Sequence, residues 1–156
     1  MIRPITHDEA AAGMALAEAS GLFQPHELEE LGRVLADYFE GDLDRAHFWL
    51  ADDDGGLVSV AYCVPEVVTT GTWNLLFIAV HPDRQGQGRG TGLLRRVEQT
   101  LAERGVCVLF VETSGTNAFE RTRAFYRKHG FNEHGRVQEY YGEGDDKVIY
   151  RKVLTR

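Results

Sequence analysis

A chain of 156 residues, of which 43% are hydrophobic and 26% charged, can bury one core and is too apolar to remain disordered. Its net charge of −7 argues against nucleic acid as the main partner. The first residues lack the apolar core and cleavage site of a secretory signal, and no apolar run is long enough to span a membrane. We therefore expect a cytoplasmic protein without membrane partners.

Charge is distributed unevenly along the chain. Residues 1–80 contain 14 acidic and three basic side chains, whereas residues 81–156 contain 10 acidic and 14 basic ones. A basic half suits a phosphate-bearing cofactor, and an acidic half suits a cationic acceptor such as an amine. Ordinary solvated helix faces explain the same distribution, so both interpretations stay open.

The cysteines and histidines do not have the spacing of a metal site. Cys63 and Cys107 lie far apart within apolar runs, which indicates buried thiols rather than a disulfide framework or a CxxC site. None of the six histidines has metal-ligand spacing, so we expect no metal. His81, beside Pro82, is typical of a residue that shapes a turn.

The pattern of apolar residues, glycines and prolines predicts strands interspersed with helices. Thr6 and Glu9 have the spacing of a capping box, and Pro25 suits the first position of a second helix. In chain order we expect a strand at 1–5, helices at 6–20 and 25–40 with Gly41 ending the second, a hairpin from Ala46, a strand at 73–80, a helix after Gly92 that ends at Gly105, a strand at 106–111, a helix at 119–129, and strands at 131–137 and 147–154. No linker or repeat interrupts this order, which predicts a single α/β domain over residues 1–156.

A glycine-rich turn between a strand and an amphipathic helix carries the clearest functional signal. Glycines occupy every second position from 86 to 92, so few side chains cover the backbone there. Backbone N–H groups and the positive end of the following helix converge at such a turn, and Arg84 and Arg89 add charge. The turn is therefore predicted to bind a phosphate.

Other phosphate-binding turns fit this stretch less well. A P-loop needs GxxxxG followed by Lys-Ser or Lys-Thr, and neither dipeptide occurs in the chain. The GxGxxG pattern of a Rossmann fold fails because Thr91, Leu93 or Arg95 falls on its third glycine, although Glu112 lies about where that fold places its ribose-binding acid. A solvated loop without a ligand remains the structural alternative.

The spacing Gln85-x-x-Gly88-x-Gly90 followed by Leu93-Leu94 resembles the (Arg/Gln)-x-x-Gly-x-(Gly/Ala) signature of the GNAT superfamily of N-acetyltransferases. The similarity extends to the Ile-Ala-Val-His-Pro strand end, to the apolar strand leading into Glu112, and to residues 124–131. By this resemblance the fold is an α/β (α+β) GNAT-like domain, with a central mixed, mostly antiparallel sheet of about six to seven strands flanked by about four helices.

The resemblance also implies acetyl-CoA as the acyl donor, its pyrophosphate held by the backbone N–H groups of residues 85–90. The positions expected to contact the cofactor are Ile78, Ala79, Val80, Gln85, Gly86, Gln87, Gly88, Arg89, Gly90, Thr91, Asn117 and Tyr126. In the common family pattern the pantetheine-binding asparagine precedes the helix tyrosine by seven positions, which here is Phe119. Asn117 matches it only across a two-residue insertion.

Two side chains are candidates for proton transfer. The resemblance assigns to Tyr126 the protonation of the leaving thiolate, for which a phenol with a pKa of about 10 is suited. Glu112 is a candidate general base that acts through water, and a main-chain N–H near residues 78–80 can polarise the thioester. A packing role for Tyr126, and a strand-capping or cation-binding role for Glu112, remain alternatives.

The acceptor is expected to contact Asn74, Glu112, Tyr140 and Tyr141. The stretch from Glu139 to Tyr150 resembles the hairpin that closes over the acceptor in ribosomal-protein alanine N-acetyltransferases, although a plain hairpin explains the same residues.

The leading hypothesis is direct attack of a primary amine, on a small molecule or a peptide N-terminus, on bound acetyl-CoA. An α-amine is favoured because its pKa of about 7.7 makes it easier to deprotonate than lysine. A catalytically silent acyl-CoA-binding or regulatory module and a Rossmann-type nucleotide-binding protein are the alternatives. The resemblance is compatible with a monomer or a homodimer.

Overall fold

The computed structural model describes residues 1–40 and 47–155. The predicted helix end at Gly41 and the predicted hairpin start at Ala46 lie outside the described residues. The chain forms two compact units, which we call unit 1 (Met1–Val64 and Phe77–Gln99) and unit 2 (Pro65–Leu76 and Thr100–Arg156).

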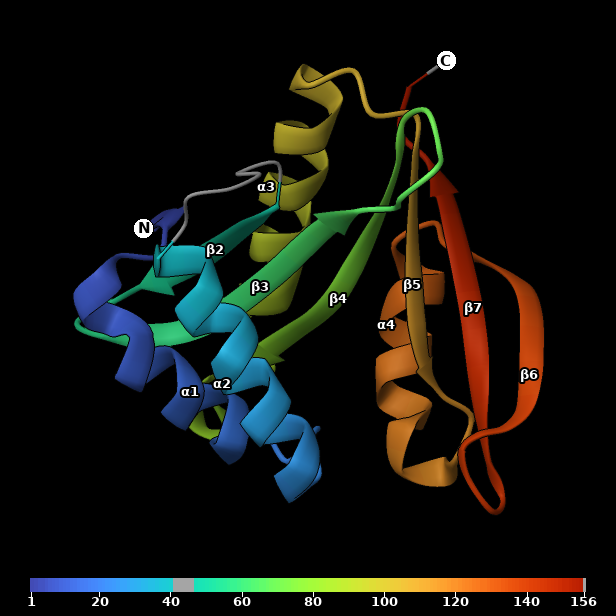
Figure 1. Ribbon diagram of the computed structural model, residues 1–156, viewed down its shortest axis with the longest axis horizontal. Helices are drawn as coiled ribbons and strands as arrows, with labels where there is room; N and C mark the ends of the chain where they lie inside the picture. Colours follow the sequence, from blue (N-terminus) through green and yellow to red (C-terminus); the bar gives the residue numbers. More distant parts are fainter. Residues whose placement is uncertain (41–46, 156) are drawn as a thin grey trace. The chain divides into compact units, whose positions relative to one another are not determined.

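Seven strands and four α-helices occupy the described residues, together with three short 3₁₀ turns, η1 to η3 (Figure 1). They are, in order, β1 (Ile2–Pro4), η1 (His7–Glu9), α1 (Ala10–Ala19), α2 (Pro25–Glu40), β2 (Phe48–Asp53), β3 (Leu57–Pro65), β4 (Thr72–Val80), η2 (Pro82–Arg84), α3 (Arg89–Glu103), β5 (Val108–Ser114), η3 (Asn117–Phe119), α4 (Glu120–Lys128), β6 (Asn132–Gly142) and β7 (Asp145–Val153).

The strands are hydrogen-bonded in the order β1-β2-β3-β4-β5-β7-β6. The pairs β1–β2, β2–β3, β5–β7 and β6–β7 are antiparallel, and β4 runs parallel to β5. This mixed, mostly antiparallel sheet confirms the predicted α/β class.

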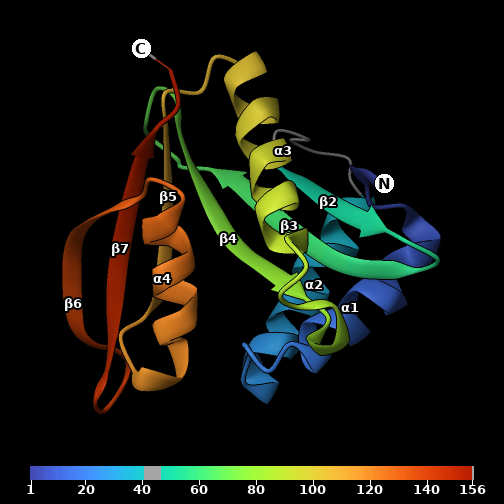
Figure 2. The same cartoon turned by 180° about the vertical axis from the view of Figure 1, so that it is seen from behind.

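Unit 1 buries an aromatic core beneath its first two helices. The helices α1 and α2 cover one face of β2, β3 and β4, and α3 covers the other (Figures 1 and 2). Trp49 stacks on Tyr62 with ring centroids 4.5 Å apart and meets Phe77 edge-on at 5.5 Å. Leu93, Leu94 and Val97 are fully buried, so the apolar face that the sequence predicted for this helix is the face that α3 buries.

The predicted capping box forms at the start of the first helical segment. The Thr6 N–H donates to Glu9 Oε1 at 2.9 Å, and the Glu9 N–H donates to the Thr6 carbonyl at 3.0 Å. Arg3 donates to both Glu9 oxygens at 2.7 Å, and these bonds lower the pKa of Glu9 to about 2. The segment begins as a 3₁₀ turn and becomes α-helical at Ala10.

In unit 2, β5 begins two residues later than the sequence predicted. The N–H groups of Gly105 and Val106 close the end of α3 on the Ala102 and Leu101 carbonyls, both at 3.0 Å. Val106 is buried in this helix-ending motif, which explains why the residue is apolar. The sequence prediction assigned this apolar residue to the strand that follows.

The β6–β7 hairpin is longer than predicted. Strand β6 continues past Val137 to Gly142, but its pairing with β7 is irregular between those two residues. Glu139 lies at the irregularity with φ +52°, a conformation that is uncommon outside glycine. A local bulge of this kind has no clear sequence signal, so the strand end was placed too early.

Candidate functional site

The glycine-rich turn of unit 1 joins β4 to α3 and is held at its first residues. The His81 N–H donates to the Val58 carbonyl at 2.9 Å, and its ring Nδ1 accepts from the Asp83 N–H at 3.1 Å. Gln85 Nε2 donates to the Val80 carbonyl at 3.2 Å. His81 therefore shapes the turn, as the sequence indicated.

Backbone N–H groups in this turn are available to a ligand. Those of Gly86, Gly88, Arg89 and Gly90 donate to no other group in the described part of the chain. Gly86 and Gly88 have φ of +77° and +78°, and no atom lies within 4 Å of the position that a Cβ would take on either. Backbone conformation, rather than space, therefore requires glycine at these two positions.

The two arginines of the turn are held by carboxylates. Asp54, in the turn between β2 and β3, accepts from Arg84 and, at 2.6 Å, from Arg89. Arg89 also reaches Asp52 Oδ2 at 3.2 Å. The hydrogen bonds from Arg84 and Arg89 lower the pKa of Asp54. The sequence indicated that both arginines add positive charge to the turn. Asp52 and Asp54 offset much of that charge, so the backbone N–H groups should contribute more than the arginines to anion binding.

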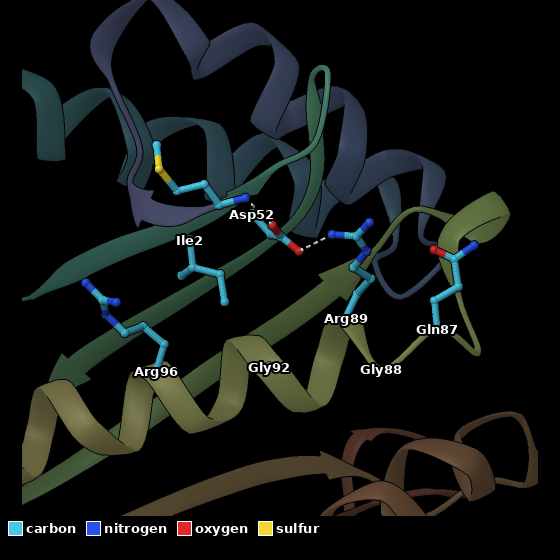
Figure 3. A pocket seen from close by; sticks show the side chains of 8 residues that line it. Ile2, Asp52, Gln87, Gly88, Arg89, Gly92 and Arg96 are labelled. Carbon is cyan, nitrogen blue, oxygen red and sulfur yellow. Dashed lines mark hydrogen bonds and ion pairs between the residues drawn. The ribbon is translucent and has the colours of Figure 1, made fainter.

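An open pocket of about 610 Å³ lies beside the turn (Figure 3). Asp52, only 5% exposed at its side chain, bonds the Met1 amine at 3.2 Å as well as Arg89. The pocket is lined by Met1, Ile2, Asp52, Gln87, Gly88, Arg89, Gly92 and Arg96. Sequence reasoning missed Asp52 and Asp54 because they lie in an earlier hairpin, 30 or more residues before the arginines that they bind, and signal only a turn.

The remaining predicted cofactor residues are distributed over both units. Ile78, Ala79 and Val80 form the last residues of β4, and Thr91 lies in the first turn of α3. Residues 72–75 of β4 pair in parallel with residues 108–111 of β5. Asn117 is exposed at the start of η3 in unit 2, and its side chain bonds no described residue.

Tyr126 lies in α4 of unit 2 and is 4% exposed. Its ring centroid is 5.5 Å from that of Phe131 and 6.4 Å from that of Tyr150. Arg127 donates to the Tyr150 hydroxyl at 3.3 Å, so the two neighbouring phenols lie in different surroundings.

Glu112 lies on β5 of unit 2 and forms an ion pair that the sequence did not predict. Lys147 Nζ, on β7, lies 2.7 Å from Glu112 Oε2 and 4.0 Å from the Tyr140 ring centroid. Burial lowers the pKa of Lys147, but the hydrogen bond and charge of Glu112 outweigh it and the pKa is raised. Tyr140 itself is 55% exposed, and Tyr141 contacts its ring edge-on at 5.1 Å.

The strand register places Asn74 on the same face as this pair. Asn74 on β4 is opposite Phe110 on β5, and Glu112 lies two residues farther along β5. Glu112 is opposite Ile149 on β7, two residues from Lys147. Because side chains two residues apart share a face, the three polar residues of unit 2 project from one side of β4, β5 and β7.

Comparison with known proteins identifies the family. The sequence family of acetyltransferase (GNAT) domains matches residues 44–133, more than half of the chain. The chain belongs to the GNAT acetyltransferase family. This GNAT acetyltransferase is thus an acetyl-CoA-dependent N-acetyltransferase, as the resemblance implied.

Three relatives show how far the likeness extends. The ribosomal protein bS18 alanine N-acetyltransferase of Escherichia coli K12 is 37% identical over 87 residues, which are 56% of this chain and 57% of that enzyme. A crystal structure assigned to the GNAT family from Desulfovibrio desulfuricans superposes with a TM-score of 0.94, at 29% identity over 99% of both chains. An aminoglycoside 6'-N-acetyltransferase crystallised with coenzyme A shares the fold, with a TM-score of 0.76 at 21% identity over 100% of this chain and 98% of that one.

No three metal-ligating side chains gather within residues 1–40 and 47–155. None of the helices that the structure describes is long and apolar enough to cross a membrane.

Proposed function

We propose that this GNAT acetyltransferase transfers an acetyl group from acetyl-CoA to a primary amine by direct attack in a ternary complex. The observation that carries the proposal is the set of unpartnered N–H groups at Gly86, Gly88, Arg89 and Gly90 where α3 begins. These groups and the positive helix end would bind the pyrophosphate of the cofactor. The coenzyme A complex of a protein with the same fold supports this assignment.

The proposed transfer forms one C–N bond and breaks one C–S bond. The amine nitrogen attacks the thioester carbon, and a main-chain N–H near residues 78–80 hydrogen-bonds the oxygen as negative charge develops there. The thiolate of coenzyme A leaves and takes a proton from the phenol of Tyr126. The proton lost by the amine passes through water to Glu112.

The geometry around Glu112 suits a base. Lys147 binds Oε2, whereas Oε1 has no partner among the described residues and the side chain is 26% exposed. The ion pair orients the carboxylate so that its second oxygen is left to accept a proton. We propose no acyl-enzyme, because Cys63 is fully buried and the Cys107 thiol faces the Gly105 carbonyl at 3.8 Å rather than a base.

The proposed acceptor is a peptide N-terminus or a small primary amine. Asn74, Glu112, Tyr140 and Tyr141 are the residues proposed to contact it. The name of one relative, an alanine N-acetyltransferase that acts on ribosomal protein bS18, supports the first choice. We propose that Asn117 contacts the pantetheine arm and that residues 85–91 contact the diphosphate.

Release of free thiol from acetyl-CoA, measured with a panel of primary amines, tests the proposal. Alaninamide represents a peptide N-terminus and n-butylamine a small amine. We expect amine-dependent thiol release that falls about 100-fold in Glu112→Gln and is unchanged in Glu29→Gln, an exposed control on α2. Tight acetyl-CoA binding without thiol release for any amine would instead indicate a silent acyl-CoA-binding module.

A further inference from the structure

Asn74 has an oxygen that the fold leaves without a hydrogen-bond donor. The side chain is 5% exposed, and its Nδ2 donates to Glu66 Oε1 at 3.3 Å. Its Oδ1 is buried and has no partner among the residues that the structure describes. Buried carbonyl oxygens in folded proteins nearly always accept a hydrogen bond, so this one requires an explanation.

Glu66 fixes which way the Asn74 amide faces. An ionised carboxylate can only accept hydrogen bonds, so the amide nitrogen must point toward Glu66 and the oxygen must point away. Glu66 is itself held where β3 ends, because its N–H donates to the Thr72 carbonyl at 2.9 Å and its carbonyl accepts from Thr69 Oγ1 at 2.8 Å. The orientation of the Asn74 oxygen is therefore built into the loop between β3 and β4.

The orphaned oxygen belongs to the face of unit 2 that carries Glu112. The register places Asn74 opposite Phe110. Glu112 follows Phe110 by two residues on β5, so its side chain lies on the same side of the sheet. That face thus holds an oriented acceptor on β4 and a paired carboxylate on β5. Lys147 engages Glu112 Oε2, whereas the uncharged Asn74 oxygen on the same face has no donor.

We propose that Asn74 Oδ1 accepts a hydrogen bond from an N–H group of a bound ligand and that Glu66 is the positioning residue that presents it. This inference rests on the proposed function. It adds that the ligand group recognised by Asn74 is a hydrogen-bond donor. The N–H donor belongs either to the acceptor, at its amine or at the amide beside it, or to an amide of the pantetheine arm. A ligand with only acceptor oxygens at this position would leave the Asn74 oxygen unpaired.

Two variants separate this role from a structural one. In Asn74→Leu an apolar side chain of similar size replaces the buried amide, which removes the unpaired oxygen together with the 3.3 Å bond to Glu66, so Tm should stay close to that of the wild type. In Glu66→Gln the residue can donate as well as accept, which lets the Asn74 amide rotate and turn its oxygen toward position 66. Glu29→Gln, an exposed glutamate on α2, serves as the matched control.

The measurement is ligand affinity in the full chain, taken separately from turnover. We expect both variants to raise the KM for alaninamide about tenfold, with kcat changed less than twofold, since one hydrogen bond corresponds to roughly that factor. If the donor is pantetheine, the Kd of acetyl-CoA measured by calorimetry without acceptor rises by that factor instead. Either shift supports the proposal and identifies the donor.

Unchanged alaninamide KM and acetyl-CoA Kd in both variants would overturn the proposal, as would a lower Tm of Asn74→Leu with both affinities intact. Failure of the proposed function has a different signature. In that case the wild-type protein releases no thiol with any amine, while the calorimetric comparison of acetyl-CoA and alaninamide binding still tests Asn74.

Discussion

Lys147 holds one oxygen of Glu112 and leaves the other unpaired. Its Nζ lies 2.7 Å from Oε2, and the lysine side chain is only 12% exposed, so the pair is shielded from much of the solvent. An ion pair with such short geometry fixes the orientation of both side chains. Its effect on catalysis should therefore appear in the rate when Lys147 is replaced.

Replacing Lys147 by methionine should lower kcat/KM about tenfold. Without the ion pair at Oε2 the Glu112 carboxylate is no longer held in one orientation, and a base that is poorly positioned accepts a proton less effectively. Lys147→Arg can keep the ion pair and should retain most of the wild-type kcat/KM. Equal kcat/KM for wild type and Lys147→Met would remove the ion pair from the mechanism.

Gly86→Ala should weaken acetyl-CoA binding. The residue has φ of +77°, a conformation that costs a residue with a Cβ about 1–2 kcal/mol, so relaxation of the turn should raise the KM for acetyl-CoA about 5- to 30-fold. Gly105→Ala, with φ of +76° at the end of α3, introduces equal strain outside the turn. A similar rise in KM in both variants would show that the effect is general destabilisation.

The properties that could be read from the sequence are local ones. The turn around Gly88 was predicted because strand, glycines and helix follow one another in the chain, and the capping box at Thr6 and Glu9 spans only four residues. The helix beginning at Pro25 was placed correctly for the same reason. Short-range backbone chemistry fixes these features before the chain folds.

Contacts between distant segments could not be predicted. The Lys147–Glu112 pair depends on the register of β5 against β7, and a slip of one residue would put the lysine on the other face. The engagement of Arg84 by Asp54 joins residues 30 apart, through a hairpin turn that carries no sequence signal for a partner. The sequence therefore located the glycine-rich turn but not the carboxylates that neutralise its arginines.

Tyr126→Phe should lower kcat about 100-fold while leaving acetyl-CoA affinity and Tm nearly unchanged. The variant keeps the ring that packs against Phe131 and removes only the hydroxyl proposed to protonate the thiolate. Tyr150→Phe is the control, because it removes a hydroxyl from a buried tyrosine of the same unit. Full activity in Tyr126→Phe would assign Tyr126 to packing alone.

The pairing of Glu9 with Arg3 predicts how stability depends on pH. The pKa of Glu9 is lowered from 4.5 to about 2 in the folded protein, so its contribution is fully present above pH 4.5 and is lost as the pH falls toward 2. Urea unfolding across this range should show a shallower fall in the free energy of unfolding for Glu9→Gln than for wild type. Glu29→Gln, on the exposed side of α2, should follow the wild-type curve. Parallel curves for wild type and Glu9→Gln would contradict the assigned pairing.

The central claim is that the backbone of the glycine-rich turn binds the diphosphate of acetyl-CoA, and amide chemical shifts test it most directly. Titration of ¹⁵N-labelled protein with acetyl-CoA should shift the N–H resonances of Gly86, Gly88, Arg89 and Gly90 and leave that of Gly105, at the end of α3, in place. NAD at the same concentrations should move none of them. Saturable acetyl-CoA binding that leaves the four resonances unmoved, or shifts produced by NAD and not by acetyl-CoA, would contradict the claim.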